Sequence, residues 1–494
     1  MDGPRSFARR TVRMKRTHKL KALALAAVAC ATWFATSRPA SGTPTDDGAL
    51  AAAICPIVYP VDQSPSDRGY RYLFYGDGFF INEQGYLMTA AHVLSQLHGG
   101  QPYVLLRQRS GPPRFVLATL IAVDRDHDVA ILRATPNPFE GKYKVAFLPL
   151  AYDWLVHSHA VLTASLRPSK PLDAYTLDAS VDERSPSEVF DFKFSQLDKG
   201  RNDTELFLFN NQVRRGQSGA PIVSADSQGV VGLVEGLWLR SSLVPLAAAA
   251  EQDTPGIGAG VPIHYAIALL QQRGIRWYTP SGTVGPYDAF SGNPQGFSPP
   301  TPISVITSPY PSQSLFGGEV VLDALIDNRG RMIETKVVRG ASPFLENVLS
   351  TVRTWSFFPA RLDGQAVAAR IGITFQFSQS HEPPRVSPPQ EIDESSPSAG
   401  DRAALPIVTV KPQYPGASAV DGSVILYDLV GTQGQLTSVQ VLRDSEPFTT
   451  AALAAVRQWH FLPGRRAGTD TDSAAIVVVA FRYSGTMHSL AQTK

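Results

Sequence analysis

The sequence predicts a multidomain chain, in which an all-β block comes first and two small α+β modules follow it. Three observations predict this organisation. The 494 residues are about three times the length of a typical domain. Residues 54–276 contain short, regularly spaced runs of β-favouring residues, which is typical of a β-sandwich or barrel. Residues 310–377 and 408–483 share one residue pattern in a single register.

Composition excludes several classes of protein. Hydrophobic residues make up 43% of the chain and charged residues 18%, so neither a disordered chain nor a polytopic membrane protein is expected. The net charge of +2 conceals an asymmetry, because residues 1–42 hold nine Lys and Arg and one acid. The remainder holds 36 basic and 42 acidic residues, a charge of −6. Such a body repels phosphate backbones, so nucleic acid is not an expected partner.

Residues 1–42 have the layout of a secretory signal. A cluster of basic residues precedes an apolar run over residues 22–35, and small residues near Ala29 or Ala40 could serve a signal peptidase. The run is short for the roughly 20 residues of a bilayer span. The segment is therefore either a cleaved signal peptide or a retained N-terminal anchor. In both cases the positive-inside rule predicts export of everything that follows.

The cysteines predict no internal disulfide bond. Cys30 lies in the signal-like segment, so Cys55 is the only cysteine left after cleavage. The apolar neighbours of Cys55 predict a buried strand. Stability is therefore expected to come from packing, even though an export compartment would permit disulfides.

Two breaker-rich stretches, residues 277–309 and 378–407, separate the three blocks. Both are rich in Pro, Gly or Ser, so they are expected to be extended, semi-rigid spacers. The first block then spans residues 54–276 and ends in a helix over residues 263–272, the one strong helical pattern that it contains.

The two modules after these spacers align at an offset of 104 residues without a gap. This offset pairs Trp355 with Trp459 and Phe344 with Phe448, and it also holds for the glycines and prolines of both modules. Each module predicts a strand, a glycine turn, a strand, a helix and a closing strand, with helical apolar residues that face one sheet. Two copies are too few for a solenoid.

The first block contains each group that acyl transfer by a serine requires. This chemistry needs a hydroxyl, an imidazole that takes its proton, a carboxylate that orients the imidazole, and N–H donors for the oxyanion. His92 follows a β-run and a glycine turn, and Asp128 precedes an apolar strand. Ser218 lies between two glycines, in the run Gly216-Gln-Ser-Gly. A tight turn at Gly216 can aim its N–H and that of Ser218 at one point.

These segments resemble the chymotrypsin-like serine proteases, most closely the HtrA/Deg-type bacterial branch. The motifs are Gly76-Asp-Gly-Phe, Thr-Ala-Ala-His92, Asp128-Val-Ala-Ile-Leu and Gly-Gln-Ser218-Gly-Ala-Pro. The resemblance implies an all-β, trypsin-like double β-barrel. It also implies that His92 is the general base, Asp128 its orienting acid and Ser218 the nucleophile, with Gly216 and Ser218 as the oxyanion hole.

Several alternatives stay open. Ala220 replaces a usual glycine and Asp77 a usual small hydroxyl residue, although neither change removes a catalytic group. Asp124 and Asp126 compete with Asp128, but only Asp128 directly precedes the apolar strand. A protease fold that has lost its activity would carry the same motifs. No acidic or cysteine partners at ligand spacing accompany His98, His157, His159 and His460, so no metal and no cofactor is expected.

The substrate pocket leaves a weaker signature. In the resembling family its floor lies a few residues before the serine, here around Gln212, and no acid occurs there, so cleavage after Lys or Arg is not favoured. Arg214 and Arg215 are either solvated or contact an acidic substrate residue. Gln217 precedes the serine and carries no charge, so it cannot pair with a freed N-terminal ammonium. This predicts activity without zymogen cleavage.

The two modules resemble the C-terminal domain of TonB, through Tyr-Pro, Gly-x-Val, the turn glycine and the Trp-x-Phe-x-Pro run at Trp355 and Trp459. The resemblance implies a three-stranded antiparallel sheet with a helix and exposed edges suited to strand addition. An envelope protein bound in this way is the expected partner. The two tryptophans are interpreted as core residues rather than contact residues.

The sequence therefore predicts an exported, periplasmic serine endopeptidase that hydrolyses peptide bonds in envelope proteins. Its expected partners are a protein or peptide substrate and a protein bound by the TonB-C-like modules. The alternative is a non-catalytic, TonB-related envelope adaptor or energy-transduction binding protein. The adaptor would need the modules but no activated serine.

Overall fold

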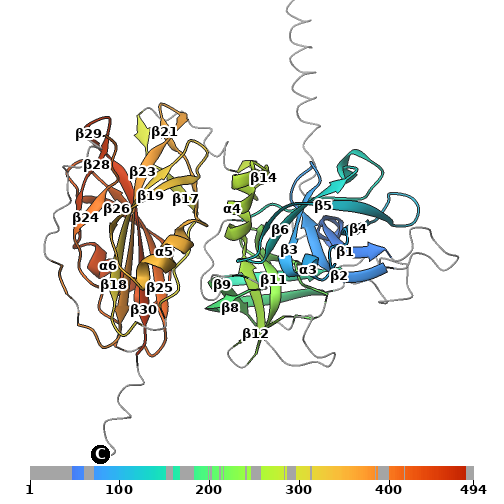
Figure 1. Cartoon of the computed structure of the whole chain (residues 1–494), viewed down its shortest axis with the longest axis horizontal. Coiled ribbons are helices and arrows are strands. Elements are labelled where there is room, and N and C mark those ends of the chain that lie inside the picture. The colour runs from blue at the N-terminus through green and yellow to red at the C-terminus, as the bar shows by residue number, and fades with distance from the viewer. Residues whose placement is uncertain are drawn as a thin grey trace, which may run out of the picture. The chain divides into compact units, whose positions relative to one another are not determined.

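The computed structural model describes most of the chain (Figure 1). The described residues are 47–60, 72–151, 159–166, 183–197, 200, 203–210, 213–214, 216–239, 242–245, 257–282, 284–285, 296–311, 314–383, 385–387, 400–416 and 418–484. The predicted signal peptide or anchor, residues 1–42, lies outside them. No helix of the described ranges combines the length and the apolar character that a membrane crossing needs.

A closed six-stranded barrel begins the described chain. Its strands run in the order β1-β2-β3-β6-β5-β4. The elements are α2 Asp47–Ala53, β1 Ile54–Pro60, β2 Tyr72–Phe80, β3 Tyr86–Ala90, α3 Ala91–Ser95, β4 Tyr103–Leu106, β5 Arg114–Asp124, β6 Val129–Thr135 and the 3₁₀ turn η1 Pro138–Glu140. Cys55 lies in β1 with no exposed surface and a free thiol, as its apolar neighbours predict. Burial raises the pKa of this thiol well above its usual value.

A seven-stranded sheet follows, in the order β10-β7-β8-β9-β13-β11-β12. An additional pairing of β10 with β11 closes six of these strands into a ring. The elements are β7 His159–Ser165, β8 Glu183–Gln196, β9 Asp203–Phe209, β10 Pro221–Ser224, β11 Val230–Leu239, β12 Ser242–Pro245, β13 Ile257–Pro262 and α4 Ile263–Arg273. The all-β, double-barrel prediction is therefore confirmed, and the predicted closing helix is α4.

The two repeats have the same element order. Repeat 1 contains β18 Gly318–Ile326, β19 Met332–Arg339, α5 Phe344–Val352, β20 Ser356–Phe358, β21 Ala360–Leu362, β22 Gln365–Val367 and β23 Ala369–Gln379. Repeat 2 contains β25 Gly422–Val430, β26 Leu436–Arg443, α6 Phe448–Val456, β27 His460–Leu462, β28 Gly464–Arg466, β29 Thr469–Thr471 and β30 Ser473–Arg482. Three long antiparallel strands and one helix form each repeat, as predicted. Trp355 and Trp459 are each 3% exposed, so both are core residues.

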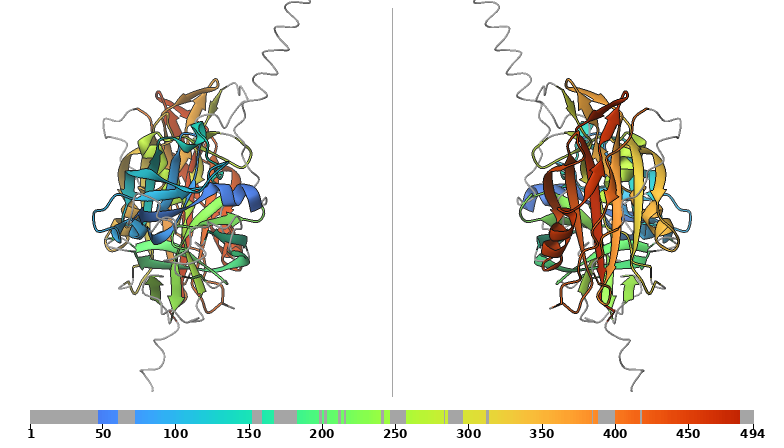
Figure 2. Two further views of the ribbon diagram at one scale, coloured as in Figure 1. Left: turned by 90° about the vertical axis from the view of Figure 1, so that its right-hand side faces the viewer. Right: turned by 90° about the vertical axis from the view of Figure 1, so that its left-hand side faces the viewer.

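The repeats join into one six-stranded sheet, in the order β19-β18-β23-β30-β25-β26. The closing strands β23 and β30 pair in parallel from Gly372 with Ala475 to Gln379 with Arg482. The right-hand view of Figure 2 shows the strands of the two repeats side by side. In separate modules β23 and β30 would each be an exposed edge strand. In this chain each covers the edge of the other. The outer strands of this sheet are β19 and β26.

The described ends of the two predicted spacers are folded. The start of the first lies against the first barrel, where Tyr278 stacks on Phe147, and the last residues of both lie against the repeats. Short pairs of strands occupy them: β14 Trp277–Tyr278 with β15 Val284–Gly285, β16 Phe297–Ser298 with β21, β17 Thr301–Ser304 with β20, and β24 Leu405–Val408 with β27. Ile303, Val305 and Leu405 are at most 2% exposed. Apolar residues between the prolines explain this packing.

Candidate active site

His92 lies in the short helix α3, directly after strand β3. Strands β3 and β6 are paired with Ala90 opposite Val129, so the residue after one strand lies beside the residue before the other. The N–H of Ala91 donates to the carbonyl of Asp128 at 3.0 Å. Strand pairing alone thus brings His92 and Asp128 together, although 36 residues separate them in the sequence.

Asp128 binds both the backbone and the ring of His92. Its Oδ1 accepts from the His92 N–H at 2.7 Å, and its Oδ2 lies 2.7 Å from Nδ1 of the ring. Asp128 is 1% exposed and adopts a φ of 54°, a strained conformation that persists where the surroundings over-determine it. The contact orients the imidazole and leaves Nε2 as the nitrogen that can take a proton.

The competing acids belong to the turn before Asp128. Oδ1 of Asp124 accepts from the N–H groups of Asp126 and His127, and Oδ2 lies 2.7 Å from Nδ1 of His127. The His127 ring stacks on Tyr265 with centroids 4.0 Å apart. Asp124 therefore shapes the loop, and Asp128 makes the contact with His92.

Ser218 lies in a tight turn that packs against the end of β3. The N–H of Asp77 donates to the carbonyl of Ser218 at 2.8 Å. The next residue, Gly219, has a φ of 80°, and a Cβ there would meet the backbones of Asp77 and Ala90. Only glycine fits this close approach. The turn thus places the serine beside the chain segment that leads into His92.

Gln217 braces the loop from within. Its Oε1 accepts from the N–H of Arg214 at 2.7 Å, and its Nε2 donates to the hydroxyl of Ser165 at 3.2 Å. The residue is 4% exposed. The polar atoms that precede the serine therefore find their partners locally, in the same domain.

His92 and Ser218 are close in the fold but are not hydrogen-bonded. Nε2 of His92 is buried without a hydrogen-bond partner among the residues that the structure describes. Over the same ranges the N–H groups of Gly216, whose φ is 92°, and of Ser218 also donate to no acceptor. Catalytic hydrogen bonds are often long without substrate. The described residues thus include an oriented imidazole, its carboxylate and two unused N–H donors, but no hydrogen bond between Ser218 and His92.

Glu235 is a residue of this site that the sequence analysis missed. It lies at the irregularity between Val234 and Gly236 in β11, is 2% exposed, and places Oε2 3.4 Å from Nδ1 of His92. This Oε2 has no hydrogen-bond partner within the described part of the chain. A signal was present in the sequence, because Glu235 is the one charged residue in the apolar run of residues 230–239.

The three side chains change one another's proton affinity. Burial and the charge of Asp128 raise the pKa of Glu235 to about 8, although His92 opposes this. Burial alone would lower the pKa of His92, but the Glu235 and Asp128 carboxylates outweigh it and raise this pKa well above its usual range. Burial would raise the pKa of Asp128, yet the contacts with His92 and Glu235 lower it. The contacts thus favour the charged form of Asp128.

His92, Asp128 and Glu235 also form the only group of potential metal ligands that is close-set in the described ranges, with ligand atoms within 4.8 Å of one another. Two ligand atoms on one tetrahedral zinc, with bonds of about 2.0–2.1 Å, would lie about 3.3 Å apart. Nδ1 of His92 and Oδ2 of Asp128 are 2.7 Å apart, which is the length of a charge-assisted hydrogen bond. The geometry fits a shared proton better than a metal ion.

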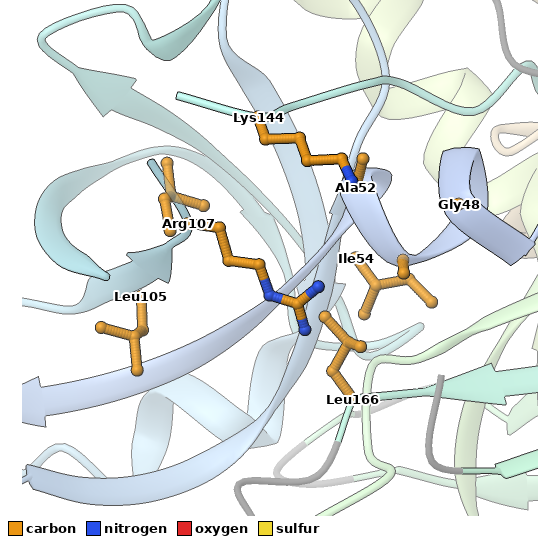
Figure 3. A pocket seen from close by; sticks show the side chains of 9 residues that line it. Gly48, Ala52, Ile54, Leu105, Arg107, Lys144 and Leu166 are labelled. Atoms are coloured by element: carbon orange, nitrogen blue, oxygen red, sulfur yellow. The ribbon is translucent and has the colours of Figure 1, made fainter. Parts of the chain in front are cut away.

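The predicted specificity residues are only partly visible. Gln212 and Arg215 lie outside the described residues, and Arg214 is exposed. The pocket in Figure 3 lies elsewhere than the predicted substrate pocket around Gln212. It is lined by α2, β1 and β4 together with Arg107, Lys144 and Leu166. None of the predicted triad residues lines it.

Comparison with protein families gives two matches. Residues 76–233 match the trypsin-like peptidase domain, a range that contains His92, Asp128 and Ser218. Residues 313–378 and 410–484 both match the C-terminal domain of the Gram-negative bacterial TonB protein. None of the curated proteins compared with the chain matches it.

Three of the solved structures to which the chain is similar are described as proteases or a protease domain. The active form of the Rv3671c protease from M. tuberculosis is 19% identical with a TM-score of 0.32, and the match covers 46% of this chain and 83% of that one. The HtrA-type protease AlgW with a decapeptide is 17% identical with a TM-score of 0.32, over 47% and 66% of the chains. The MamO protease domain from Magnetospirillum magneticum is 18% identical with a TM-score of 0.30, over 44% and 96%.

Proposed function

Because the chain carries a trypsin-like peptidase domain followed by two TonB C-terminal domains, we propose that it is a serine endopeptidase of the bacterial envelope. His92 acts as the general base, Asp128 orients it, and Ser218 attacks the peptide carbonyl. The 2.7 Å contact between Asp128 and His92 carries this proposal. It supports one defined orientation of the imidazole, with Nε2 left to take the serine proton.

The unused N–H groups of Gly216 and Ser218 support a role as the oxyanion hole. A peptide carbonyl bound there would develop negative charge during attack, and preformed donors stabilise that charge. Substrate binding would also close the gap between Ser218 and His92, in keeping with the long contacts of substrate-free enzymes. The local bracing of Gln217 supports activity without zymogen cleavage.

Export to the periplasm is part of the same proposal. It rests on the basic and apolar layout of residues 1–42 and on the TonB-type domains. Envelope proteins are then the accessible substrates. The outer strand β19 exposes Ile333 (56%) and Val337 (40%), which favours it as the edge to which a partner strand adds. Lysines in place of both residues would weaken such binding and leave peptide hydrolysis unchanged.

An active-site fluorophosphonate probe tests the proposal, because it labels only an activated serine. We expect labelling of the wild type, none of Ser218→Ala, and a loss of peptide turnover of about 10⁴-fold or more for Ser218→Ala and for His92→Ala. Ser423→Ala, in strand β25 of the second repeat, is the control and should behave as wild type. A fully active Ser218→Ala enzyme would refute the triad.

A non-catalytic envelope adaptor is the second candidate, and the unformed Ser218–His92 hydrogen bond favours it. An adaptor would bind peptides or partners without turnover. Absence of both labelling and turnover, with peptide binding intact, would support the adaptor and refute the peptidase.

A further inference from the structure

We propose that Glu235 is a second carboxylate partner of His92, and that its protonation sets the pH range in which His92 can act as a base. This inference rests on the proposed peptidase function and deepens it. A Ser-His-Asp triad contains one carboxylate beside the imidazole. Here there are two: Asp128 from the turn before β6 and Glu235 from β11.

A β-bulge determines the position of Glu235. The register of β11 against β13 shifts between Val234 and Gly236, so Glu235 is the extra residue of a bulge. A bulge re-aims a side chain, and this one brings Oε2 to 3.4 Å from Nδ1 of His92. The oxygen is buried and accepts no hydrogen bond across the described ranges. A buried carboxyl oxygen without a partner is costly, so a cation or a proton must compensate it.

Two charged groups shift the pKa of Glu235, namely His92 and Asp128. The described side chains of β10 and β13, which flank β11, carry no titratable group. The titratable group of strand β3 is Tyr86, at the end of the strand far from His92. Those of α4 are His264, Tyr265 and Arg273. Two carboxylates and one imidazole therefore form a closed group that exchanges protons among its own members.

The consequence for catalysis follows from charge. With Glu235 protonated, His92 faces the single charge of Asp128. With Glu235 ionised, it faces two negative charges, which favour the imidazolium form. An imidazolium cannot accept the serine proton, so the base becomes available only at higher pH. Glu235 ionises above about pH 8, so the wild-type His92 is expected to become a free base only in the alkaline range, and removal of the Glu235 charge should raise activity above that pH.

The test is the pH dependence of kcat/KM for wild type and for Glu235→Gln, which keeps the shape and removes the titrating group. Because the pKa of Glu235 is about 8, the two proteins should have the same activity at pH 6. The variant should reach half of its maximal kcat/KM at least one pH unit lower, with the gain in activity above about pH 8. Asp428→Ala is the matched control, because it removes a buried carboxyl of similar pKa in the second repeat. Its profile should coincide with that of wild type. Coincident profiles for Glu235→Gln and wild type would overturn the proposal.

A second readout needs no turnover. In protein with isotope-labelled histidine, the ring signals of His92 are assigned by their loss in His92→Asn and titrated by NMR. The pKa of His92 should fall by at least one unit in Glu235→Gln, or in Glu235→Met if the glutamine variant does not fold. An unchanged titration would overturn the proposal. If Ser218-dependent turnover is absent but the titration shifts, the proposed function fails and the proton coupling stands.

A chelator separates protons from metal ions. EDTA should leave the wild-type profile and the NMR titration unchanged, because the compensating charge is a proton. A chelator-induced shift in wild type that is absent in Glu235→Gln would overturn the proposal in favour of a bound cation.

Discussion

The two repeats have the same fold but bury their carboxylates differently. In repeat 1, Asp323 lies 3.1 Å from Arg370, and its other oxygen accepts from the N–H of Ala403. In repeat 2, neither oxygen of Asp428 has a hydrogen-bond partner in the part of the chain that the structure describes. At the offset of 104 residues, Asp428 corresponds to Ala324, and Arg370 corresponds to Ala474.

The contrast shows what a partner does to a buried acid. Burial raises the pKa of Asp323, but the Arg370 guanidinium and the Ala403 N–H act against it. Burial acts alone on Asp428 and raises its pKa to about 8. The same sheet topology thus contains one buried carboxylate with a cationic partner and one that has none among the described residues and must take a proton to remain buried.

Asp428→Ala should have the largest effect, because it removes the unpaired acid. The folded-state pKa lies above the unfolded value, so the folded state binds the extra proton and wild-type stability falls as pH rises from about 4 to about 8. Between pH 5 and pH 9 the loss is about 4 kcal/mol. The variant should be more stable than wild type at pH 9 and close to it at pH 5. Hydrogen exchange of the β25 amides at both pH values measures this, and equal protection in both proteins at pH 9 would contradict it.

Asp323→Ala should act in the opposite direction. It leaves the guanidinium of Arg370, whose side chain is 16% exposed, with only the exposed Glu334 as partner. Breaking a partly buried charged contact costs roughly 1–3 kcal/mol. Denaturant unfolding at pH 7 should show this loss, whereas Asp428→Ala shows a gain. Stabilisation by both variants would mean that the Arg370 pair is not what separates the repeats.

Gly372→Ala tests a second difference between the repeats. A Cβ at Gly372 would collide with the backbone of Ala404, which crosses the sheet at that point, whereas the corresponding position of repeat 2 is Ile476. Overpacking of this kind costs about 1–3 kcal/mol. We expect a lower melting temperature for Gly372→Ala, with Gly416→Ala, where a Cβ meets nothing within 4 Å, as the control.

Glu334→Ala should have the smallest effect. Glu334 contacts Arg370 at 3.1 Å, but its side chain is 52% exposed. Exposed ion pairs contribute about 0–1 kcal/mol. The unfolding free energy should therefore change by less than 1 kcal/mol, and by less still in high salt. A loss as large as that of Asp323→Ala would show that Glu334 is the main partner of Arg370.

Much of the fold was predictable from the sequence, because local pattern dictates it. The 104-residue offset, the strand runs and the helices of both repeats follow from periodicity. His92 and Asp128 were identifiable because they flank two strands that pair directly, so their contact depends on one register. The burial of Cys55 in a strand was predictable from its apolar neighbours alone.

The remainder depends on contacts between distant segments. Glu235 reaches His92 only through a bulge in β11, which no local pattern predicts. The parallel pairing of β23 with β30 joins strands about 100 residues apart, and each strand looks the same whether its edge is open or covered. The prolines between residues 277 and 309 suggested a spacer, although Ile303 and Val305 are buried.

The seam between β23 and β30 has an evolutionary consequence. Once a duplicated module closes its edge on its twin, neither copy can be lost alone, because the survivor would expose a long row of unpaired backbone groups on an apolar strand. Such an edge recruits other chains and aggregates. The two repeats therefore depend on each other for the cover of their closing strands.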